Sequence, residues 1–248
     1  MSNSGTIRVG IGGWVYPPWR RSFYPAGLRQ AEELAHASRH VTAIEINGTF
    51  YRTQTPASFR KWHAETPADF VFSLKGPRFL THRRELASAE PYMARFFESG
   101  FLELGTKLGP ILWQFAPTLA FDPADFAAFL DLLPAQLGNR PIRHVVEVRH
   151  DSFRAAEFFD LLRRHNVAVA LVDDAKYPGF TELTADFAYL RLRRCAEDEP
   201  AGYPPAALDD WAACLRKWSA EGRDAFLYFI NGAKIRAPHA AQALLGRL

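Results

Sequence analysis

HVVEVR, residues 144–149, alternates charged with β-branched side chains over the length of one short strand. Successive side chains of a strand point to opposite faces, so Glu147 and Arg149 share one face and Val146 and Val148 share the other. In a closed barrel the apolar face packs against helices, and the opposite face lines the interior. The same alternation of inward polar and outward apolar side chains occurs in two other segments, 43–47 and 187–193.

Eight apolar, β-branched or aromatic segments recur along the 248 residues, and most neighbouring pairs leave room for a helix between them. Alternating β and α units favour a parallel sheet with helices outside it, and a count of eight favours closure into a barrel. The sequence therefore predicts a single α/β domain, a TIM-type (β/α)8 barrel that spans residues 1–248. The predicted strands are Ile7–Gly13, Ala43–Asn47, Phe70–Lys75, Ile111–Phe115, His144–Arg149, Val167–Asp173, Phe187–Arg193 and Ala225–Asn231.

Capping residues followed by proline mark the starts of two of the predicted helices. Thr55-Pro56 and Asp122-Pro123 each place a side-chain acceptor directly before a proline at the first helical position. Either Asp151 or Ser152 is expected to cap the helix after the fifth strand. The segment 178–186, between strands six and seven, has room for little more than one helical turn. We expect an abbreviated or missing helix there.

The composition is that of an ordinary globular protein, with 48% hydrophobic residues, 23% charged residues and a formal net charge of +3. Cys195 and Cys214 provide neither a disulfide framework nor a paired metal-ligand spacing. The N-terminus shows no leader pattern, and no apolar run approaches the length of a membrane span. We therefore expect a cytoplasmic protein without a membrane partner. The oligomeric state is not predicted.

No cofactor and no metal are predicted. Gly10, Gly12 and Gly13 end the first strand, but they lack the third glycine in register and the following helix of a dinucleotide-binding fingerprint. The plausible metal ligands show no local metal motif; they are Glu45, Glu147, His150 and Asp173.

Active sites of (β/α)8 barrels form where strands end and the following loops begin. Carboxylates held among cations stay ionised and can act as bases, and imidazoles titrate closest to neutral pH. The predicted catalytic residues are Glu45, Glu147, His82 and His150. The predicted substrate-binding residues are Trp14, Tyr16, Asn47, Tyr51, Lys75, Arg78, Gln114, Arg149, Asp173, Arg191, Arg193 and Asn231.

The inward-facing charges have two interpretations. In the first, Glu45 and Glu147 neutralise the arginines of strands five and seven in a buried ion-pair network that fills the barrel interior. In the second, the same side chains form a charge-selective pocket, where Arg149 and Arg193 bind an anion and Lys75 supplies a point charge. The aromatic residues of the first two loops likewise form either a stacking platform for bases or sugars, or a lid packed on the barrel mouth.

Five groups of residues form a combined signature: Gly12-Gly13-Trp14-Val15-Tyr16 with Trp19 and Phe23-Tyr24-Pro25; Glu45-Ile46-Asn47-Gly48-Thr49-Phe50-Tyr51-Arg52; Phe72-Ser73-Leu74-Lys75 with Thr81-His82; Leu108-Gly109-Pro110-Ile111-Leu112-Trp113-Gln114-Phe115; and Glu147-Val148-Arg149-His150. Together they resemble the domain-of-unknown-function 72, or YecE-like, family over nearly the whole chain. The resemblance implies a TIM-type barrel but brings no established activity. Two segments depart from the family pattern: Arg193-Arg194 replaces its usual His-Gly, and Ile230-Asn231 replaces its paired asparagines. The chemistry at strands seven and eight is therefore expected to differ.

Three functions fit these residues. The first is a hydrolase or lyase that acts on an anionic, phosphate-bearing substrate, with arginines stabilising the developing charge. The second is a non-catalytic protein that binds a nucleotide or nucleic acid through phosphates and stacked bases. The third is a glycoside hydrolase with Glu45 and Glu147 as its acid pair, although Gln114 and arginines stand where barrel glycosidases usually carry carboxylates. Whether the protein is an enzyme stays open at this point.

Overall fold

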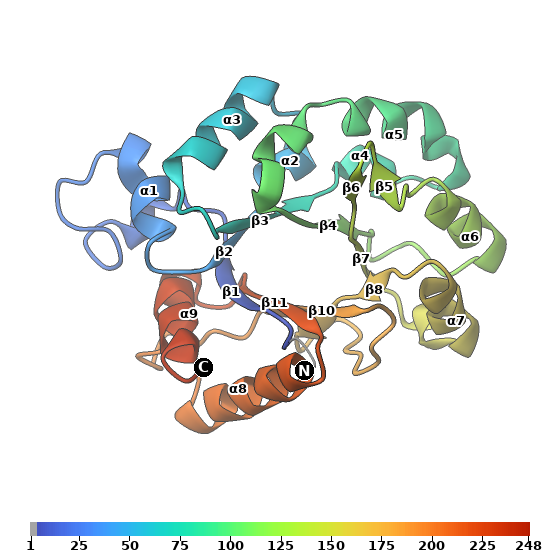
Figure 1. Ribbon diagram of the computed structural model, residues 1–248. Helices are drawn as coiled ribbons and strands as arrows, with labels where there is room; N and C mark the ends of the chain where they lie inside the picture. The colour runs from blue at the N-terminus through green and yellow to red at the C-terminus, as the bar shows by residue number, and fades with distance from the viewer. Residues whose placement is uncertain (1–3) are drawn as a thin grey trace.

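The computed structural model describes residues 4–248 and shows parallel strands that form a ring inside a layer of helices (Figure 1). Neighbouring strands pair in the order β8-β7-β4-β3-β2-β1-β11-β10-β9. The strands are β1 (Ile7–Gly12), β2 (Ala43–Ile46), β3 (Val71–Lys75), β4 (Leu108–Gln114), β7 (His144–Glu147), β8 (Ala168–Val169), β9 (Leu171–Asp173), β10 (Phe187–Leu192) and β11 (Asp224–Phe229).

The ring closes through the predicted sixth strand, which is divided into two short pieces around Ala170. β8 pairs with β7 on one side, and β9 pairs with β10 on the other. Between them, the Ala170 N–H donates to the carbonyl of Val146 at 2.8 Å. Every pair in the ring is parallel. The predicted α/β barrel is confirmed. Because the strands are parallel, their carboxyl ends all lie at the same end of the barrel, which is its mouth.

Helices cover the outside of the ring, with a small antiparallel pair, β5 (Gln136–Leu137) and β6 (Arg140–Pro141), before β7. The α-helices are α1 (Glu33–Ala37), α2 (Gly48–Tyr51), α3 (Pro56–Glu65), α4 (Arg78–Thr81), α5 (Glu90–Phe97), α6 (Pro123–Asp131), α7 (Ala156–Arg164), α8 (Pro205–Ala220) and α9 (Ala237–Leu245). The 3-10 turns are η1 (Pro17–Trp19), η2 (Gln30–Glu32), η3 (Ala87–Ala89), η4 (Phe101–Lys107), η5 (Asp151–Arg154) and η6 (Lys234–Arg236). Across residues 4–248, none of these helices combines the length and the apolar character that crossing a bilayer requires.

Two of the predicted helix caps are confirmed. The Thr55 hydroxyl oxygen accepts the N–H of Ser58 at 3.2 Å at the start of α3. Asp122 accepts two N–H groups of the first turn of α6, at 3.0 and 3.1 Å. Both satisfy donors that a helix start otherwise leaves without partners.

The predicted cap of α7 is wrong. The helix begins only at Ala156, and residues 151–154 form the separate turn η5. His150 Nδ1 accepts the N–H of Ser152 at the start of this turn. The Ser152 hydroxyl is engaged elsewhere, because it accepts the N–H of Phe121 at 2.7 Å. A contact across 31 residues therefore overrides the local capping signal.

No helix forms in the segment 174–186, as the expectation of an abbreviated or missing helix allowed. The segment runs back along β8, where the buried Thr184 hydroxyl accepts from Val169 N and donates to the carbonyl of Val167. The chain between β9 and β10 is thus a loop at the barrel mouth, and it brings Asp174 and Tyr177 toward the strand ends.

The strand side chains divide into an outer and an inner layer, as the alternation predicts. Ile44, Ile46, Val146, Val148, Leu190 and Leu192 all belong to the large buried cluster between strands and helices. A smaller cluster fills the interior and includes Ala43, Leu112, Val145, Ala168, Ala170, Tyr189 and Tyr228. The charged residues of the same strands lie above this inner layer, near the mouth, and form the floor of the pocket described next.

Candidate functional site

A pocket of about 390 Å³ opens at the carboxyl ends of the strands. Its walls contain side chains from β3, β4 and β10 and from the loops that follow β2, β7 and β11. Every charged residue among them is a cation, and no carboxylate from residues 4–248 lines the space. The lining residues are Asn47, Tyr51, Lys75, Gln114, Arg149, Arg191, Arg193, Ile230, Asn231 and Lys234.

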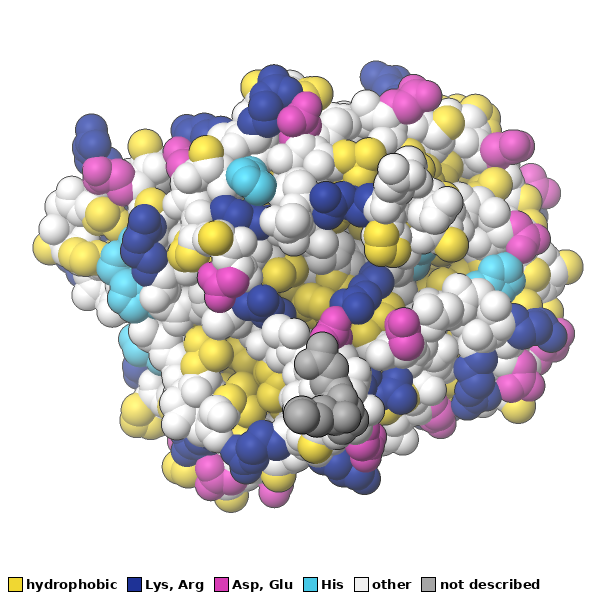
Figure 2. Space-filling view, viewed as in Figure 1, with side chains coloured by type: hydrophobic (Ala, Val, Ile, Leu, Met, Phe, Trp, Pro, Cys, Tyr) yellow, Lys and Arg dark blue, Asp and Glu magenta, His cyan; other side chains and the backbone are white. Residues whose placement is uncertain are grey.

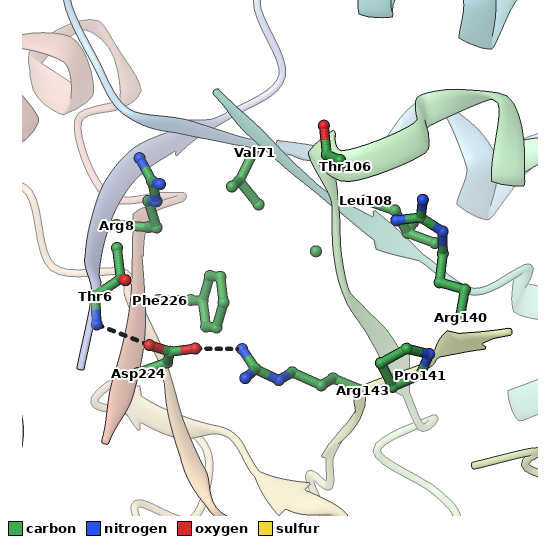
Figure 3. A pocket seen from close by; sticks show the side chains of 11 residues that line it. Thr6, Arg8, Val71, Thr106, Leu108, Arg140, Pro141, Arg143, Asp224 and Phe226 are labelled. Carbon is green, nitrogen blue, oxygen red and sulfur yellow. Dashed lines mark hydrogen bonds and ion pairs between the residues drawn. The ribbon is translucent and has the colours of Figure 1, made fainter. Parts of the chain in front are cut away.

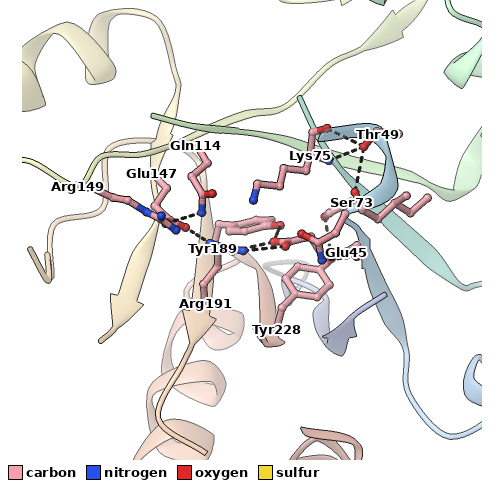
Figure 4. Close-up of polar contacts among 12 residues, drawn as sticks. Glu45, Thr49, Ser73, Lys75, Gln114, Glu147, Arg149, Tyr189, Arg191 and Tyr228 are labelled. Carbon is pink, nitrogen blue, oxygen red and sulfur yellow. Dashed lines mark hydrogen bonds and ion pairs between the residues drawn. The ribbon is translucent and has the colours of Figure 1, made fainter. Parts of the chain in front are cut away.

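Arg191 is the centre of the pocket floor (Figure 4). It is 1% exposed and donates to both carboxylate oxygens of Glu45, at 2.9 and 3.0 Å. It also donates to Glu147 on the neighbouring side. The Tyr189 hydroxyl adds a third hydrogen bond to Glu45 at 2.8 Å. Burial opposes the charge of Arg191, but Glu147 and Glu45 raise its pKa, so the guanidinium stays protonated.

Both carboxylate oxygens of Glu147 also accept hydrogen bonds from neighbouring side chains. Its Oε1 accepts from the Gln114 amide at 2.7 Å and from Arg149, whose Nε and Nη2 both lie 2.9 Å away. Burial alone would raise the pKa of Glu147, but Arg191, Arg149 and Lys75 outweigh it and hold the pKa at about 2. Such a carboxylate is ionised at neutral pH and is a weak base. The predicted ion-pair network is therefore present, and Glu45 and Glu147 lie beneath the pocket lining.

Arg193 retains hydrogen-bonding capacity on the pocket wall. Its Nη1 lies 2.9 Å from Asp174 Oδ2 as an ion pair without hydrogen-bond geometry. Its Nη2 donates to the Asn231 side-chain oxygen at 3.0 Å when that amide is oriented to satisfy both of its neighbours. Within residues 4–248, its Nε and Nη1 have no hydrogen-bond acceptor. Both nitrogen atoms are shielded from solvent, so Arg193 offers an anion its positive charge at the pocket wall rather than these two donors.

The ring of Tyr177 supports two of these arginines from the loop between β9 and β10. The guanidinium carbon of Arg149 lies 4.5 Å from the ring centroid, and that of Arg193 lies 5.5 Å from it. Both distances are within the range of cation–π attraction. Tyr177 therefore interacts favourably with two like-charged groups, both of which line the pocket.

Lys75 ends β3 and extends into the same space as Gln114 and Glu45 (Figure 4). It is 6% exposed, and its Nζ lies 3.9 Å from the centroid of the Phe50 ring. Burial, with a contribution from Arg191, lowers the pKa of Lys75 to about 7, although Glu45 and Glu147 oppose this shift. Lys75 was expected to supply a point charge; with this pKa it is a proton acceptor near neutral pH.

A second lobe of about 380 Å³ adjoins the cationic pocket and shares Asn47, Tyr51 and Lys234 with it. Its walls are aromatic: the rings of Trp14 and Trp62 meet edge to face, with centroids 5.2 Å apart. Tyr51 is 71% exposed where the two lobes meet. The mouth thus offers a cationic compartment next to an aromatic one.

Seven of the predicted residues line neither lobe: Glu45 and Glu147, which lie beneath the floor, and Tyr16, Arg78, His82, His150 and Asp173. Asp173 accepts from the Tyr203 hydroxyl at 2.9 Å, so β9 directs it toward a neighbouring loop. His150 caps η5, and His82 is exposed with its ring against Phe50. Burial and the charge of Arg78 lower the pKa of His82, which leaves it neutral at pH 7. We therefore remove both histidines from the candidate catalytic group.

The structure also brings to the site residues that the sequence did not predict. Lys234 lines both lobes from η6, and its Nζ lies 5.0 Å from the centroid of the Tyr16 ring. Tyr177 comes from the loop without a helix, and Tyr189 comes from the inner face of β10. Only Tyr189 carried a sequence signal, because it lies two residues before Arg191 on the same strand face.

The opposite end of the barrel has a pocket of about 290 Å³, which Figure 3 shows from close by. Figure 2 shows a hollow near the centre of one face, with basic side chains around an apolar floor. Arg143 pairs there with Asp224 at 2.7 Å, and Asp224 also accepts the N–H of Thr6. Arg140 donates to a backbone carbonyl, and Arg8 lies near an exposed aspartate. Because these arginines have protein partners, and because catalytic residues of such barrels lie at the other end, we take the mouth as the candidate site.

Metal-binding capacity is limited in the part of the chain that the structure describes. No group of three or more His, Cys, Asp or Glu side chains between residues 4 and 248 is arranged to surround a metal ion. The plausible ligands considered above are dispersed: Glu45 and Glu147 bind arginines, His150 caps a turn and Asp173 binds Tyr203.

A family model described as "Protein of unknown function DUF72" matches residues 8–248. This chain belongs to the DUF72 family. The "UPF0759 protein YecE" of Escherichia coli K12 is 30% identical over 152 residues, which is 60% of this chain and 50% of YecE. The "UPF0759 protein YunF" of Bacillus subtilis is 26% identical over 160 residues, or 62% of this chain and 54% of YunF. The chain thus spans about half the length of the curated relatives it matches.

Solved structures agree on the fold. A DUF72 family protein from Thermotoga maritima superposes with a TM-score of 0.75 at 24% identity, and the match covers 97% of each chain. More distant barrels include D-psicose 3-epimerase from Clostridium cellulolyticum H10, with a TM-score of 0.53, 12% identity and coverage of 96% and 97%. At these identities the likeness shows the fold alone. The DUF72 barrel is thus established, whereas its chemistry must be inferred from the pocket.

Proposed function

We propose that this protein is an enzyme of the lyase or hydrolase class that acts on a small anionic, phosphate-bearing substrate at the barrel mouth. The observation that carries the proposal is the charge of the pocket, whose charged lining residues are all cations. Glu45 and Glu147 neutralise part of this charge from below, and Asp174 neutralises a further part beside Arg193. Even without Lys75, four cations face three carboxylates, so a positive excess remains for a substrate.

The arginines of the pocket differ in role: some can bind a substrate, and one supports the pocket floor. Arg191 donates to both Glu45 and Glu147 in the floor, whereas Arg193 lines the pocket wall and pairs with a single carboxylate, that of Asp174, among residues 4–248. Planar guanidinium groups bind phosphate and carboxylate oxygens in pairs, and they stabilise negative charge that develops in a transition state. Arg193 and Arg149 are therefore the substrate-binding pair, with Tyr177 fixing their separation.

Proton transfer is assigned to Lys75. The carboxylates predicted as bases are buried and hydrogen-bonded to arginines, and the two histidines lie outside the pocket. Lys75 lines the pocket, and its pKa of about 7 matches the requirement for a general base at neutral pH. The same facts disfavour a glycoside hydrolase, because Arg191 binds both members of the carboxylate pair.

A thermal-shift panel tests this function. The ligands are inorganic phosphate, sugar phosphates, nucleotides and neutral sugars, applied to the wild type, Arg193→Gln and Arg194→Gln. A ligand at about 100 times its Kd adds roughly 2.7 kcal/mol to the free energy of unfolding, or several degrees in Tm. Arg194 is the matched control, because its side chain is 63% exposed and does not line the pocket.

We expect phosphorylated ligands to raise the Tm of the wild type and of Arg194→Gln but not that of Arg193→Gln. A response to neutral sugars alone, or an equal response of the two variants, would contradict the proposal. Binding of nucleotides without turnover of any phosphorylated compound would instead favour the non-catalytic alternative, for which the aromatic lobe beside the cations is the supporting observation.

A further inference from the structure

Lys75 differs from an ordinary buried lysine in its surroundings. Lys107 is also buried, but its Nζ donates to the carbonyl of Thr66 at 2.7 Å and to the carbonyl of His63. For Lys75, no hydrogen bond of the side chain and no carboxylate within 4.0 Å is found among residues 4–248. Its nearest described partner is the face of the Phe50 ring. The lone pair of a neutral Lys75 amine would therefore be free to react.

The backbone of Lys75 is fixed although its amine is not. The buried Thr49 hydroxyl donates to the Lys75 carbonyl at 2.6 Å and accepts the Lys75 N–H at 3.3 Å. Thr49 lies in α2, directly after β2, so two neighbouring strand ends are tied together at this point (Figure 4). The amine is thus presented into the pocket from a rigid position, which is what nucleophilic catalysis requires.

The burial of Lys75 favours its neutral form, whereas the neighbouring charges act in both directions. Burial has the largest effect on its pKa, followed by Arg191, and both lower it; Glu45 and Glu147 raise it, and Arg149 lowers it further. With a pKa of about 7, roughly half of the Lys75 amines are unprotonated at pH 7, compared with well under 1% for an unperturbed lysine. Desolvation and neighbouring cations are the means by which proteins activate lysine toward carbonyl compounds.

We propose that Lys75 is a nucleophile that forms a Schiff base with a small aldehyde or ketone carrying an anionic group. This inference rests on the proposed function, because Arg193 and Arg149 must bind the anionic group while the carbonyl carbon lies near Lys75 Nζ. It narrows the substrate to anionic carbonyl compounds, and it favours the lyase class, since an iminium ion withdraws electrons from a neighbouring carbon–carbon bond.

The covalent step is balanced without any other reactant. The Lys75 nitrogen lone pair attacks the carbonyl carbon, a C–N bond forms, and proton transfer gives a carbinolamine. The C–O bond then breaks, and the two hydrogens of the amine leave with the carbonyl oxygen as water. The product is a C=N bond between Lys75 and the substrate, which takes up one proton to become the iminium ion. Hydrolysis by one water molecule reverses the step and restores the amine.

Reductive trapping tests the proposal. The full-length protein is incubated at pH 7 with pyridoxal 5′-phosphate, an aldehyde that carries a phosphate, and the imine is reduced with sodium cyanoborohydride. Peptide mass spectrometry then measures labelling at each lysine: Lys61, Lys75, Lys107, Lys176, Lys217 and Lys234. We expect Lys75 to be labelled at least tenfold faster than the exposed Lys217 or the hydrogen-bonded Lys107, and we expect inorganic phosphate to slow labelling at Lys75 alone.

The pH dependence of labelling separates a lysine with a lowered pKa from a lysine that is merely accessible to the reagent. Labelling at Lys75 should rise from pH 5 to about 7 and then level off, whereas labelling at Lys217 should continue to rise toward pH 10. Labelling of Lys234 in place of Lys75, or labelling of Lys75 that neither levels off nor responds to phosphate, would overturn the proposal.

The same samples separate this inference from the function on which it rests. Phosphate binding is measured by thermal shift on the wild type and on Lys75→Met, whose apolar side chain cannot form an imine. If phosphate stabilises the wild type through Arg193 while Lys75 resists labelling, the Schiff base is refuted and the anion site stands. If phosphate does not bind at all, the proposed function itself fails.

Discussion

Arg191 and Glu45 form two parallel hydrogen bonds in the floor of the barrel mouth, from Nε to Oε2 at 2.9 Å and from Nη2 to Oε1 at 3.0 Å. Both side chains are almost completely buried. Each charge of the pair therefore neutralises the other, and the pair forms the floor beneath the other cations of the pocket. Its geometry distinguishes residues that support the site from residues that can meet a ligand.

Breaking this pair should destabilise the fold. Glu45→Gln leaves the buried Arg191 with one carboxylate instead of two, and removing one partner of a buried ion pair typically costs about 3–5 kcal/mol. Urea denaturation measures the loss. Glu32→Gln, which removes the exposed partner of Arg29, is the control and should leave the urea midpoint unchanged. Equal midpoints for the two variants would show that the Arg191 floor is not a structural element.

Lys75 should make the stability of the protein depend on pH. Because the folded pKa of about 7 lies below the usual 10.5, the unfolded chain binds more protons between these values, so stability rises with pH across this window. The charged amine is fully destabilising below about pH 7, by at most about 5 kcal/mol at about 1.4 kcal/mol for each pKa unit, and the effect disappears near pH 10.5.

Chemical denaturation of Lys75→Met at pH 6.5 and pH 9.5 measures this effect. The variant should be more stable than the wild type at pH 6.5, and the difference should shrink at pH 9.5. Lys217→Met removes the same charge from the exposed side of α8 and corrects for net charge. A difference that grows with pH would contradict the lowered pKa.

Replacing Tyr177 should lower the affinity for anions without changing the net charge of the protein. Tyr177→Leu removes the ring beneath Arg149 and Arg193, which lets the two guanidinium groups separate. Cation–π contacts at partly exposed sites contribute about 0.5–1 kcal/mol each, so loss of the two contacts should lower phosphate affinity by roughly 5- to 30-fold. Isothermal titration calorimetry measures the change. Tyr92→Leu, which removes the ring beside Arg83 outside the pocket, should bind phosphate as the wild type does.

Tyr51 should discriminate among phosphorylated ligands. It is exposed at the junction of the cationic and aromatic lobes, where it can stack on a ring attached to the phosphate. Tyr51→Ala should weaken nucleotide binding by about 1–3 kcal/mol and leave inorganic phosphate binding unchanged. Calorimetric titrations with the two ligands provide the comparison. Equal loss for both would mean that Tyr51 shapes the cationic lobe rather than the aromatic one.

The alternation of polar and apolar residues predicted which side chains of a strand point into the barrel and which point toward the helices. The inward direction of Glu147 and Arg149 follows from a period of two, and so does the burial of Val146 and Val148 against helices. The cap at Thr55 followed from a local pattern in the same way. The cap of α7 could not be predicted, because Phe121, far away in the chain, engages the Ser152 hydroxyl.

The site residues that lie at strand ends could be predicted from the sequence, whereas those in the loops could not. Arg191 and Arg193 were found because they lie at a strand end, whereas Tyr177 and Lys234 lie in segments without regular period. The environment of Lys75 could not be read from the sequence either. Burial lowers its pKa most, and Arg191 lowers it further; both depend on the packing of strands that are far apart in the chain.

The position of a bound anion tests the central claim most directly. Crystals soaked in tungstate, a phosphate-like anion with a strong anomalous signal, would show where the protein concentrates negative charge. We predict an anomalous peak in the mouth pocket, within hydrogen-bonding distance of Arg193 and Arg149 and near Lys75. A mouth without a peak, with tungstate bound only at the Arg8, Arg140 and Arg143 pocket at the opposite end, would contradict the account.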